Sequence, residues 1–130
     1  MHALYVLFIK IEEERRIRVG SLGLLRFIPG RYAYVGKALG ISLEKRVSRH
    51  MRREKKLRWH IDYLTSVERP RYVYYTRELK EEYELVELLK SYGWREAFRG
   101  FGSSDDKRSA SHLLYNKKLV VPKELRLLEL

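Results

Sequence analysis

Two tyrosines, Tyr32 and Tyr34, occupy alternate positions in the stretch RYAYVGKALG, residues 31 to 40. Alternate residues of a strand point to the same side, so both hydroxyl groups could face one ligand. A tyrosine hydroxyl can take a proton from an attacking water if neighbouring cations lower its pKa from about 10. The chain contains ten tyrosines, so either one alone is more simply a packing residue. A chemical role therefore depends on the side chains nearby.

The residues that follow the tyrosines supply cations. Ser42 is the predicted N-cap of a helix over residues 43–54, whose apolar residues recur every four positions as a buried stripe. At about 100° per residue, Arg46, His50 and Arg53 fall together on the flank of that stripe. These three side chains could bind one ligand.

The same helix opens a basic block. From residue 42 to residue 58 there are eight lysines and arginines against two glutamates, and Trp59 and His60 follow directly. Such a run is usually a solvated helix face, but this one has few acids to pair with and adjoins a ring on which a base could stack. We therefore favour nucleic-acid binding. The predicted contacts are Lys37, Arg49, Arg52, Arg53, Lys55, Lys56, Arg58, Trp59 and His60.

Two polar residues of the stretch WHIDYL, His60 and Asp62, have two interpretations. They could contact DNA or support the site from behind. A buried His–Asp pair that braces the fold explains them nearly as well.

One acidic residue is unusual in a later predicted helix, residues 78–91. On a helical wheel, Glu82 falls inside the apolar arc between Val86 and Leu89. An ionised carboxylate there is costly unless it meets a cation. A salt bridge to an arginine and a divalent metal explain it equally well from these residues alone. One carboxylate with phosphate and water is an ordinary set of ligands for magnesium.

The composition limits the partners and the chemistry. At 130 residues the chain is predicted to be a single domain spanning residues 1–130. The absence of cysteine excludes thiol catalysis and cysteine-bound zinc, and with a charged fraction of 35% it fits adaptation to high temperature. A net charge of +11 favours nucleic acid as partner over an anionic membrane. Because no long apolar run or signal-like start is present, we expect a cytoplasmic protein.

The elements that must position these residues are a mixture of strands and helices. The segment ALYVLFIKI, residues 3–11, is apolar without alternation, which predicts a strand buried on both faces. Residues 57–64 fit a short helix or a strand, and residues 98–106 are glycine-rich and irregular. Antiparallel strands are predicted at 17–20, 22–27 and 32–36, further strands at 71–75 and 111–115, and a closing helix at 122–130.

An ordered set of motifs resembles the GIY-YIG nuclease superfamily. The sequence YVG at residues 34–36, followed through KALGISLEKRV by Arg46, is similar to the second half of its signature. The further order ALYVLFIKI, VGSLG, RVSRH, WHIDYL, EYEL, GFGSSD and SHLLY resembles a largely archaeal branch related to Uri-type endonucleases. Domains of that branch also occur fused to an endonuclease III-type repair glycosylase. The resemblance extends from about Leu4 to Tyr115.

The resemblance implies an α+β fold in which a small central antiparallel sheet is flanked by helices. It implies a metal-dependent endonuclease that hydrolyses phosphodiester bonds in DNA during repair, with one Mg²⁺ or Mn²⁺ ion bound by Glu82. Arg46 would bind phosphate, and His50 would act as a base, as a donor to phosphate or as a partner for a tyrosine. The catalytic residues implied are Tyr5, Tyr34, Arg46, His50 and Glu82.

The chain departs from the family pattern in two places. The first motif reads ALY rather than Gly-Ile-Tyr, and 28 residues separate Tyr5 from Tyr34. Aligning GSL at residues 20–22 instead restores the usual spacing but supplies no tyrosine. The two cysteines that the branch has after GFGSSD are replaced by Asp106 and Arg108, so cysteine is not essential here.

Two other functions fit the same residues. One is a non-catalytic module that binds DNA or RNA, with a repair protein as a further partner. The other is a repair enzyme specific for abasic or otherwise damaged sites. The presence of Tyr34, Arg46 and Glu82 favours the endonuclease. The sequence does not distinguish DNA from RNA and does not indicate an oligomeric state.

Overall fold

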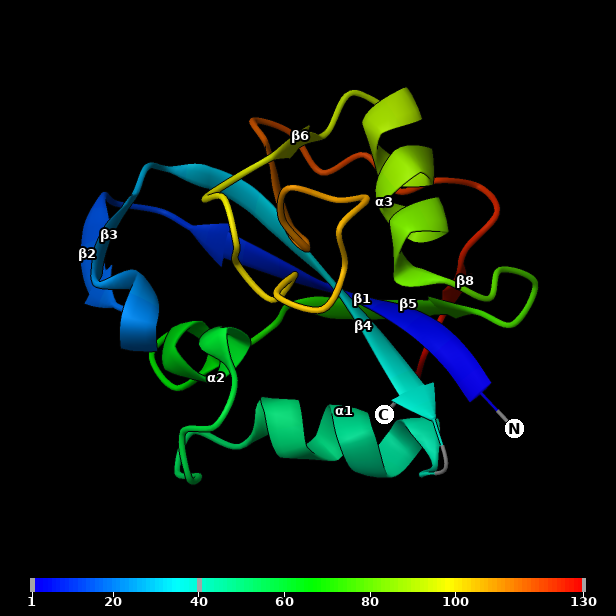
Figure 1. Cartoon of the computed structure of the whole chain (residues 1–130), viewed down its shortest axis with the longest axis horizontal. Coiled ribbons are helices and arrows are strands. Elements are labelled where there is room, and N and C mark those ends of the chain that lie inside the picture. The colour runs from blue at the N-terminus through cyan, green and yellow to red at the C-terminus, as the bar shows by residue number, and fades with distance from the viewer. Residues whose placement is uncertain (1, 40, 130) are drawn as a thin grey trace.

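The computed structural model describes residues 2–39 and 41–129, which form an antiparallel sheet with helices on both faces (Figure 1). The strands are β1 (His2–Ile11), β2 (Arg15–Arg18), β3 (Leu24–Phe27), β4 (Gly30–Leu39), β5 (Tyr72–Thr76), β6 (Arg95–Glu96), β7 (Leu113–Asn116) and β8 (Arg126–Leu127). The helices are α1 (Leu43–Met51), α2 (His60–Thr65) and α3 (Glu82–Ser91), with a 3₁₀ turn at Gly20–Leu22. The six-stranded sheet has the order β6-β7-β4-β1-β5-β8, and β2 and β3 form a separate hairpin. This α+β fold confirms the predicted fold class.

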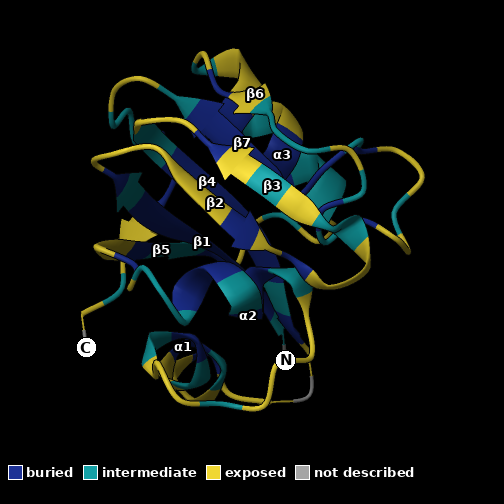
Figure 2. Cartoon of the chain, turned by 90° about the vertical axis from the view of Figure 1, so that its left-hand side faces the viewer, coloured by how far each residue is buried: buried dark blue, intermediate teal, exposed yellow. Residues whose placement is uncertain are grey.

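The central strand β1 is buried on both faces, as its continuous apolar sequence predicts. Alternate residues of β1 enter two clusters, one shared with α1, α2 and the β2–β3 hairpin, the other shared with α3, Trp94 and Leu125. In Figure 1, α1 and α2 therefore lie below the sheet and α3 above it. Figure 2 shows β1 and β4 largely buried, while β3 carries exposed residues. The two central strands thus form a rigid platform for polar side chains.

The first helix is shorter than the predicted 43–54. Ser42 is its N-cap, and the Ser42 side chain accepts a hydrogen bond from the backbone N–H of Lys45 at 3.1 Å. The helix ends at Met51 because Arg52 adopts an extended conformation and the Lys55 ammonium group donates to the carbonyls of Arg49 and His50. Arg53 therefore lies beyond the helix and does not share a helix flank with the predicted ligand-binding pair.

The helix predicted at 78–91 begins four residues later, at Glu82. The Glu84 carboxylate accepts hydrogen bonds from the backbone N–H groups of Glu81 and Lys80, at 2.9 and 3.1 Å. This capping box fixes the first turn of α3. Glu82 is therefore the first residue of α3 rather than an interior one.

The structure decides between the alternatives for residues 57–64 and differs from the prediction for the C-terminal segment. Residues 57–64, which fitted a helix or a strand, contain the start of α2. The closing helix predicted at 122–130 is wrong over the described residues, because residues 122–125 form a turn and β8 pairs with β5. The pairing covers part of the edge of β5, and Leu125 is buried in the core, so tertiary contacts outweigh helix propensity here. Residue 130 lies outside the described part.

None of the helices between residues 2 and 129 that the structure describes has the length and apolarity to cross a membrane.

Candidate active site

A cavity of about 850 Å³ lies over β1 and β4 and reaches the start of α3. Four residues predicted as catalytic line it: Tyr5, Tyr34, Arg46 and Glu82. They come from β1, β4, α1 and α3, so the fold brings together residues far apart in the sequence. Five lysines or arginines and four aspartates or glutamates line the cavity. Its walls therefore nearly balance in charge and can accept both an anionic group and a cation.

Tyr5 is held against β4 by a glycine. Tyr5 and Gly36 are directly paired across β1 and β4, and a Cβ atom at position 36 would overlap the Tyr5 ring. The absence of a side chain at Gly36 thus allows the Tyr5 ring to lie over the strand. The Tyr5 hydroxyl is 2.7 Å from His50 Nε2, and both side chains are buried. Of the three roles expected for His50, namely base, donor to phosphate and partner for a tyrosine, the structure shows the contact with a tyrosine.

The electrostatics of this pair follow from burial. Burial raises the pKa of Tyr5 well above its usual value, with the nearby Tyr34 as a further cause, and the opposing charge of Arg46 is outweighed. Burial, followed by the charge of Lys55, lowers the pKa of His50 to about 3. Cations were expected to lower the tyrosine pKa, and desolvation outweighs them. Tyr5 is therefore a neutral hydroxyl beside a neutral imidazole at pH 7.

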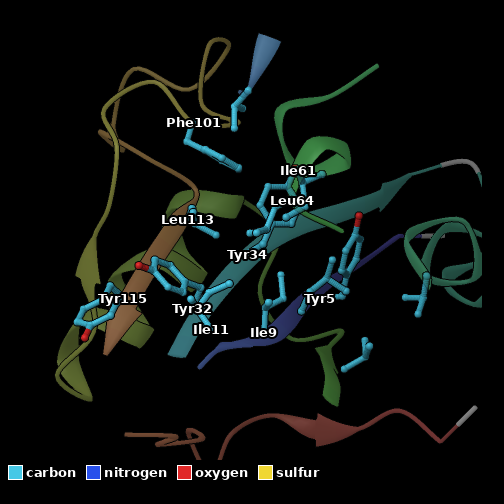
Figure 3. Packing of buried hydrophobic residues seen from close by; sticks show 14 of the residues in the cluster. Tyr5, Ile9, Ile11, Tyr32, Tyr34, Ile61, Leu64, Phe101, Leu113 and Tyr115 are labelled. Atoms are coloured by element: carbon cyan, nitrogen blue, oxygen red, sulfur yellow. The ribbon is translucent and has the colours of Figure 1, made fainter. Parts of the chain in front are cut away.

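Tyr32 and Tyr34 point to the same face of the sheet, as their spacing predicts, but they have different surroundings (Figure 3). Tyr32 packs against Tyr115, and its hydroxyl donates to the carbonyl of Ile28 at 2.8 Å. It is a core residue and does not line the cavity. Tyr34 does line it, and burial raises the pKa of Tyr34 strongly, so its hydroxyl stays protonated and can donate a hydrogen bond.

Arg46 is held by an aromatic ring. Its guanidinium carbon lies 5.0 Å from the centre of the Trp59 ring, and that of Arg49 lies 4.5 Å from it. The Arg46 Nε atom is buried and has no hydrogen-bond partner among the described residues. A buried unpaired donor in a cavity wall is suited to an acceptor such as a phosphate oxygen.

The Trp59 ring is in turn positioned by Asp62. This fully buried carboxylate accepts two hydrogen bonds from Arg49, at 2.8 and 2.9 Å, and two from the backbone N–H groups of Arg58 and Trp59. Burial opposes ionisation of Asp62, but the hydrogen bonds from Arg49, Trp59 and Arg58 hold its pKa below the ordinary value. Asp62 therefore supports the site from behind and anchors Arg49.

His60 has a partner of its own rather than Asp62. Its Nδ1 atom accepts a hydrogen bond from the backbone N–H of Gly102 at 2.9 Å. Gly102 has a φ of +69°, and a Cβ atom there would approach Tyr34 to 3.0 Å. His60 thus fixes the glycine-rich loop against the cavity, and His60 itself also lines the cavity.

The predicted nucleic-acid contacts fall into three groups. Lys37, Arg58, Trp59 and His60 line the cavity. Arg49 is bound to Asp62, and the Lys55 ammonium group donates to Thr65 Oγ1 as well as to two carbonyls of α1. The exposed remainder comprises Arg52, Arg53 and Lys56. A second hollow of about 340 Å³ is lined by Arg49, Arg52, Glu54, Lys55, Lys56 and Arg58, so Arg58 faces both hollows.

Glu82 meets no arginine among the described residues, although a salt bridge to one was an equal alternative. Burial raises the pKa of Glu82 above its usual value, against the influence of His112 and Lys37. Its side chain is 31% exposed, and its Oε2 atom is 3.7 Å from His112 Nδ1. A half-buried carboxylate in a cavity wall fits a divalent cation, since its oxygens are hard ligands and no described residue donates a hydrogen bond to them.

The cavity residues that sequence reasoning did not assign to the site include His112 and Asp106. His112 lies directly before β7 and Asp106 lies in the irregular segment after residue 98. His112 occurs in the motif SHLLY, and Asp106 directly follows the motif GFGSSD, but nothing in their spacing connects either residue with Glu82. A polar residue placed directly before a buried strand was the available signal.

The structure thus defines an α+β protein in which a central antiparallel sheet carries a polar cavity lined by two tyrosines, an arginine and a glutamate. A protein-family model described as domain of unknown function DUF123 matches residues 4–127, and the chain belongs to this family. Comparison with curated proteins and with solved structures gave no significant match. The family match includes the stretch from Leu4 to Tyr115.

Proposed function

We propose that this chain is a metal-dependent endonuclease of the GIY-YIG type that hydrolyses phosphodiester bonds in DNA, with a role in DNA repair. One observation carries the proposal. Tyr5, Tyr34, Arg46 and Glu82 line a single cavity, although they come from four different elements. A core that needed only packing would not gather an unpaired arginine donor and a half-buried carboxylate there.

Arg46 is suited to bind the scissile phosphate. Its stacked guanidinium group stays charged as negative charge builds up on the phosphate in the transition state. The buried Nε donor would gain the partner that it lacks. Tyr34, whose pKa burial raises, would donate a hydrogen bond to the same phosphate group.

Tyr5 and His50 are suited to position the attacking water. The Tyr5 hydroxyl lies 2.7 Å from His50 Nε2, so the neutral imidazole can accept its hydrogen bond and leave an oxygen lone pair of Tyr5 to accept one from the water. Burial lowers the pKa of His50 to about 3 and raises that of Tyr5, so neither group holds the water proton at pH 7. As the water oxygen bonds to phosphorus and the bond from phosphorus to the leaving oxygen breaks, the water proton passes to solvent and the leaving oxygen takes a proton from solvent.

Glu82 would hold the divalent ion, Mg²⁺ or Mn²⁺. The bound ion supplies Lewis-acid stabilisation of charge on the phosphate and the leaving oxygen. The carboxylate is the hard oxygen ligand that both ions prefer, and it lines the same cavity as the cationic Arg46.

Affinity for DNA would come from cations outside the cavity. Arg52, Arg53 and Lys56 are exposed, and Arg58 connects the cavity to the basic hollow. Trp59 is 37% exposed and offers a ring on which a base could stack. These contacts would be mostly to phosphate and would depend little on base sequence.

The proposal is tested by incubating the purified protein with single-stranded, duplex, branched and abasic DNA and with RNA, in Mg²⁺, in Mn²⁺ and in EDTA. We expect cleavage of DNA that needs the metal, and we expect Arg46→Ala and Glu82→Ala each to remove most of this cleavage. Binding without cleavage under all conditions would instead support the non-catalytic module. Cleavage confined to abasic DNA would support the lesion-specific enzyme.

A further inference from the structure

The strongest unexplained feature of the cavity is His112, which the proposed chemistry does not use. His112 is 2% exposed, yet its ring lines the cavity. Its backbone is fixed on both sides, because its N–H donates to the carbonyl of Phe101 and its carbonyl accepts from Val35. The ring is therefore held firmly beside Glu82.

The two ring nitrogens of His112 have different surroundings. Nε2 is 2.7 Å from Asp106 Oδ2, and the other oxygen of Asp106 accepts from the backbone N–H of Arg108 at 2.8 Å. An aspartate carboxylate only accepts hydrogen bonds, so Nε2 carries the proton. The lone pair of a neutral ring is then on Nδ1. That atom is buried, has no hydrogen-bond partner among the described residues and lies 3.7 Å from Glu82 Oε2.

A purely structural ion triad of Glu82, His112 and Asp106 does not explain this geometry. A doubly protonated ring would donate from Nδ1 to Glu82 at about 2.8 Å, as charged N–H groups do. The observed 3.7 Å is too long for a hydrogen bond and would leave a buried donor unpaired. The separation is instead the one expected when the lone pairs of His112 Nδ1 and Glu82 Oε2 face each other with no proton between them.

The same separation suits a shared metal ion. Ligands about 2.1 Å from one ion, at angles of about 90 to 110°, lie about 3.0 to 3.4 Å apart. The gap of 3.7 Å between Nδ1 and Oε2 would need to close by only a few tenths of an ångström. A histidine that ligates a metal usually donates its other N–H group to a carboxylate, which is the relation of His112 to Asp106.

We infer that His112 Nδ1 is a second protein ligand of the divalent ion at Glu82 and that Asp106 is a positioning residue, which fixes the imidazole tautomer. This inference rests on the proposed function for the presence of the ion. Among the described residues, no group of three or more histidine, aspartate or glutamate side chains is spaced to hold a metal. The two ligands therefore leave the other coordination positions to water and the substrate phosphate.

A nitrogen ligand changes which ions the site prefers. Imidazole suits Mn²⁺, Co²⁺ and other transition metals better than Mg²⁺, which prefers oxygen ligands throughout. The site should therefore bind Mn²⁺ more tightly than Mg²⁺, by a margin that depends on His112.

The test is Mn²⁺ binding to the metal-free protein without nucleic acid. Electron paramagnetic resonance of free Mn²⁺ gives the affinity, and pulsed measurements detect nitrogen bound directly to the ion. We expect one bound Mn²⁺ with a nitrogen coupling, which changes to the ¹⁵N pattern in protein labelled only with ¹⁵N-histidine. His112→Gln should remove the coupling and weaken Mn²⁺ binding at least tenfold, while changing Mg²⁺ binding by less than about threefold. Asp106→Asn should weaken Mn²⁺ binding about tenfold.

His2→Gln is the matched control, because His2 lies at the start of β1 and does not line the cavity. It should leave the nitrogen coupling and the Mn²⁺ affinity unchanged. Absence of a nitrogen coupling in the labelled native protein, or a coupling that persists in folded His112→Gln, overturns the inference. Cleavage assays separate the two proposals. A protein that cuts DNA but shows no nitrogen coupling refutes only the ligand role, and one that binds Mn²⁺ through His112 but cuts nothing refutes only the nuclease.

Discussion

Replacing Gly36 by alanine should displace Tyr5 and disable the cavity. Glycine inside a strand normally weakens it, so an alanine in its place usually stabilises a protein by about 0.5 to 1 kcal/mol. At Gly36 the sign should reverse, since the added Cβ would overlap the Tyr5 ring of the paired strand. The ring cannot move aside without losing contacts, because it is 2% exposed and its hydroxyl is bonded to His50.

The size of the effect follows from two contributions. Forcing an extra group into a packed core costs about 1 to 3 kcal/mol. Breaking the bond from Tyr5 leaves the second nitrogen of the buried His50 unpaired, which costs about 1 to 3 kcal/mol more. We therefore expect Gly36→Ala to lower the free energy of unfolding by about 2 to 6 kcal/mol and to reduce cleavage more than tenfold.

A double-mutant cycle with Tyr5→Leu measures whether the ring is the cause. Chemical denaturation would give the free energy of unfolding of the native protein, both single variants and the double variant. In the Tyr5→Leu background the ring is absent, so Gly36→Ala should be neutral or slightly stabilising. An equal loss of stability in both backgrounds would refute the reasoning, because the glycine would then be needed for another contact.

Three other outcomes are expected. Arg46→Ala should lower the cleavage rate about 10²- to 10³-fold while DNA affinity changes less than about threefold, measured by single-turnover kinetics and fluorescence anisotropy. Reversing Arg52, Arg53 and Lys56 to glutamate should weaken DNA binding strongly and flatten its dependence on salt, and unchanged affinity would mean that this face is only solvated. Because the pKa of His50 is about 3 when folded and about 6.5 when unfolded, the unfolded chain binds the extra proton. The contribution of His50 to the free energy of unfolding is therefore fully present above pH 6.5 and falls by up to about 4 kcal/mol towards pH 3. Denaturation of His50→Gln at a series of acidic pH values should not show this loss.

The parts of the fold that local pattern controls could be predicted. The apolar run of β1 and the capping serine of α1 determine those elements almost alone. The ends of α1 and α3 could not be placed, because a lysine side chain from beyond the helix and a capping box at residues 81–84 set them. The sequence of the C-terminal segment predicts a helix, but pairing of its last residues with β5 stabilises the fold more than a helix would.

The candidate site was predicted unevenly for a related reason. Glu82 was identified because a carboxylate on an apolar face is an anomaly that a helical wheel detects, even with the helix start misplaced. His112 was missed because its two partners are 6 and 30 residues away in the chain. The basic block was interpreted as one surface, yet Arg49 and Lys55 bind inside the protein. Charge in a sequence does not show which cations already have internal partners.

Two residues of the cavity carry unsatisfied polar atoms. Among the described residues, five buried side-chain atoms have no hydrogen-bond partner, and two of them, Arg46 Nε and His112 Nδ1, belong to residues that line the cavity. Each such atom costs about 1 to 3 kcal/mol, and proteins rarely keep them without cause. Both residues line the cavity, Arg46 over the Trp59 ring and His112 beside Glu82 and Asp106. A phosphate and a divalent ion bound together would satisfy both at once. Without them, the same side chains leave the folded protein less stable than its core packing alone allows.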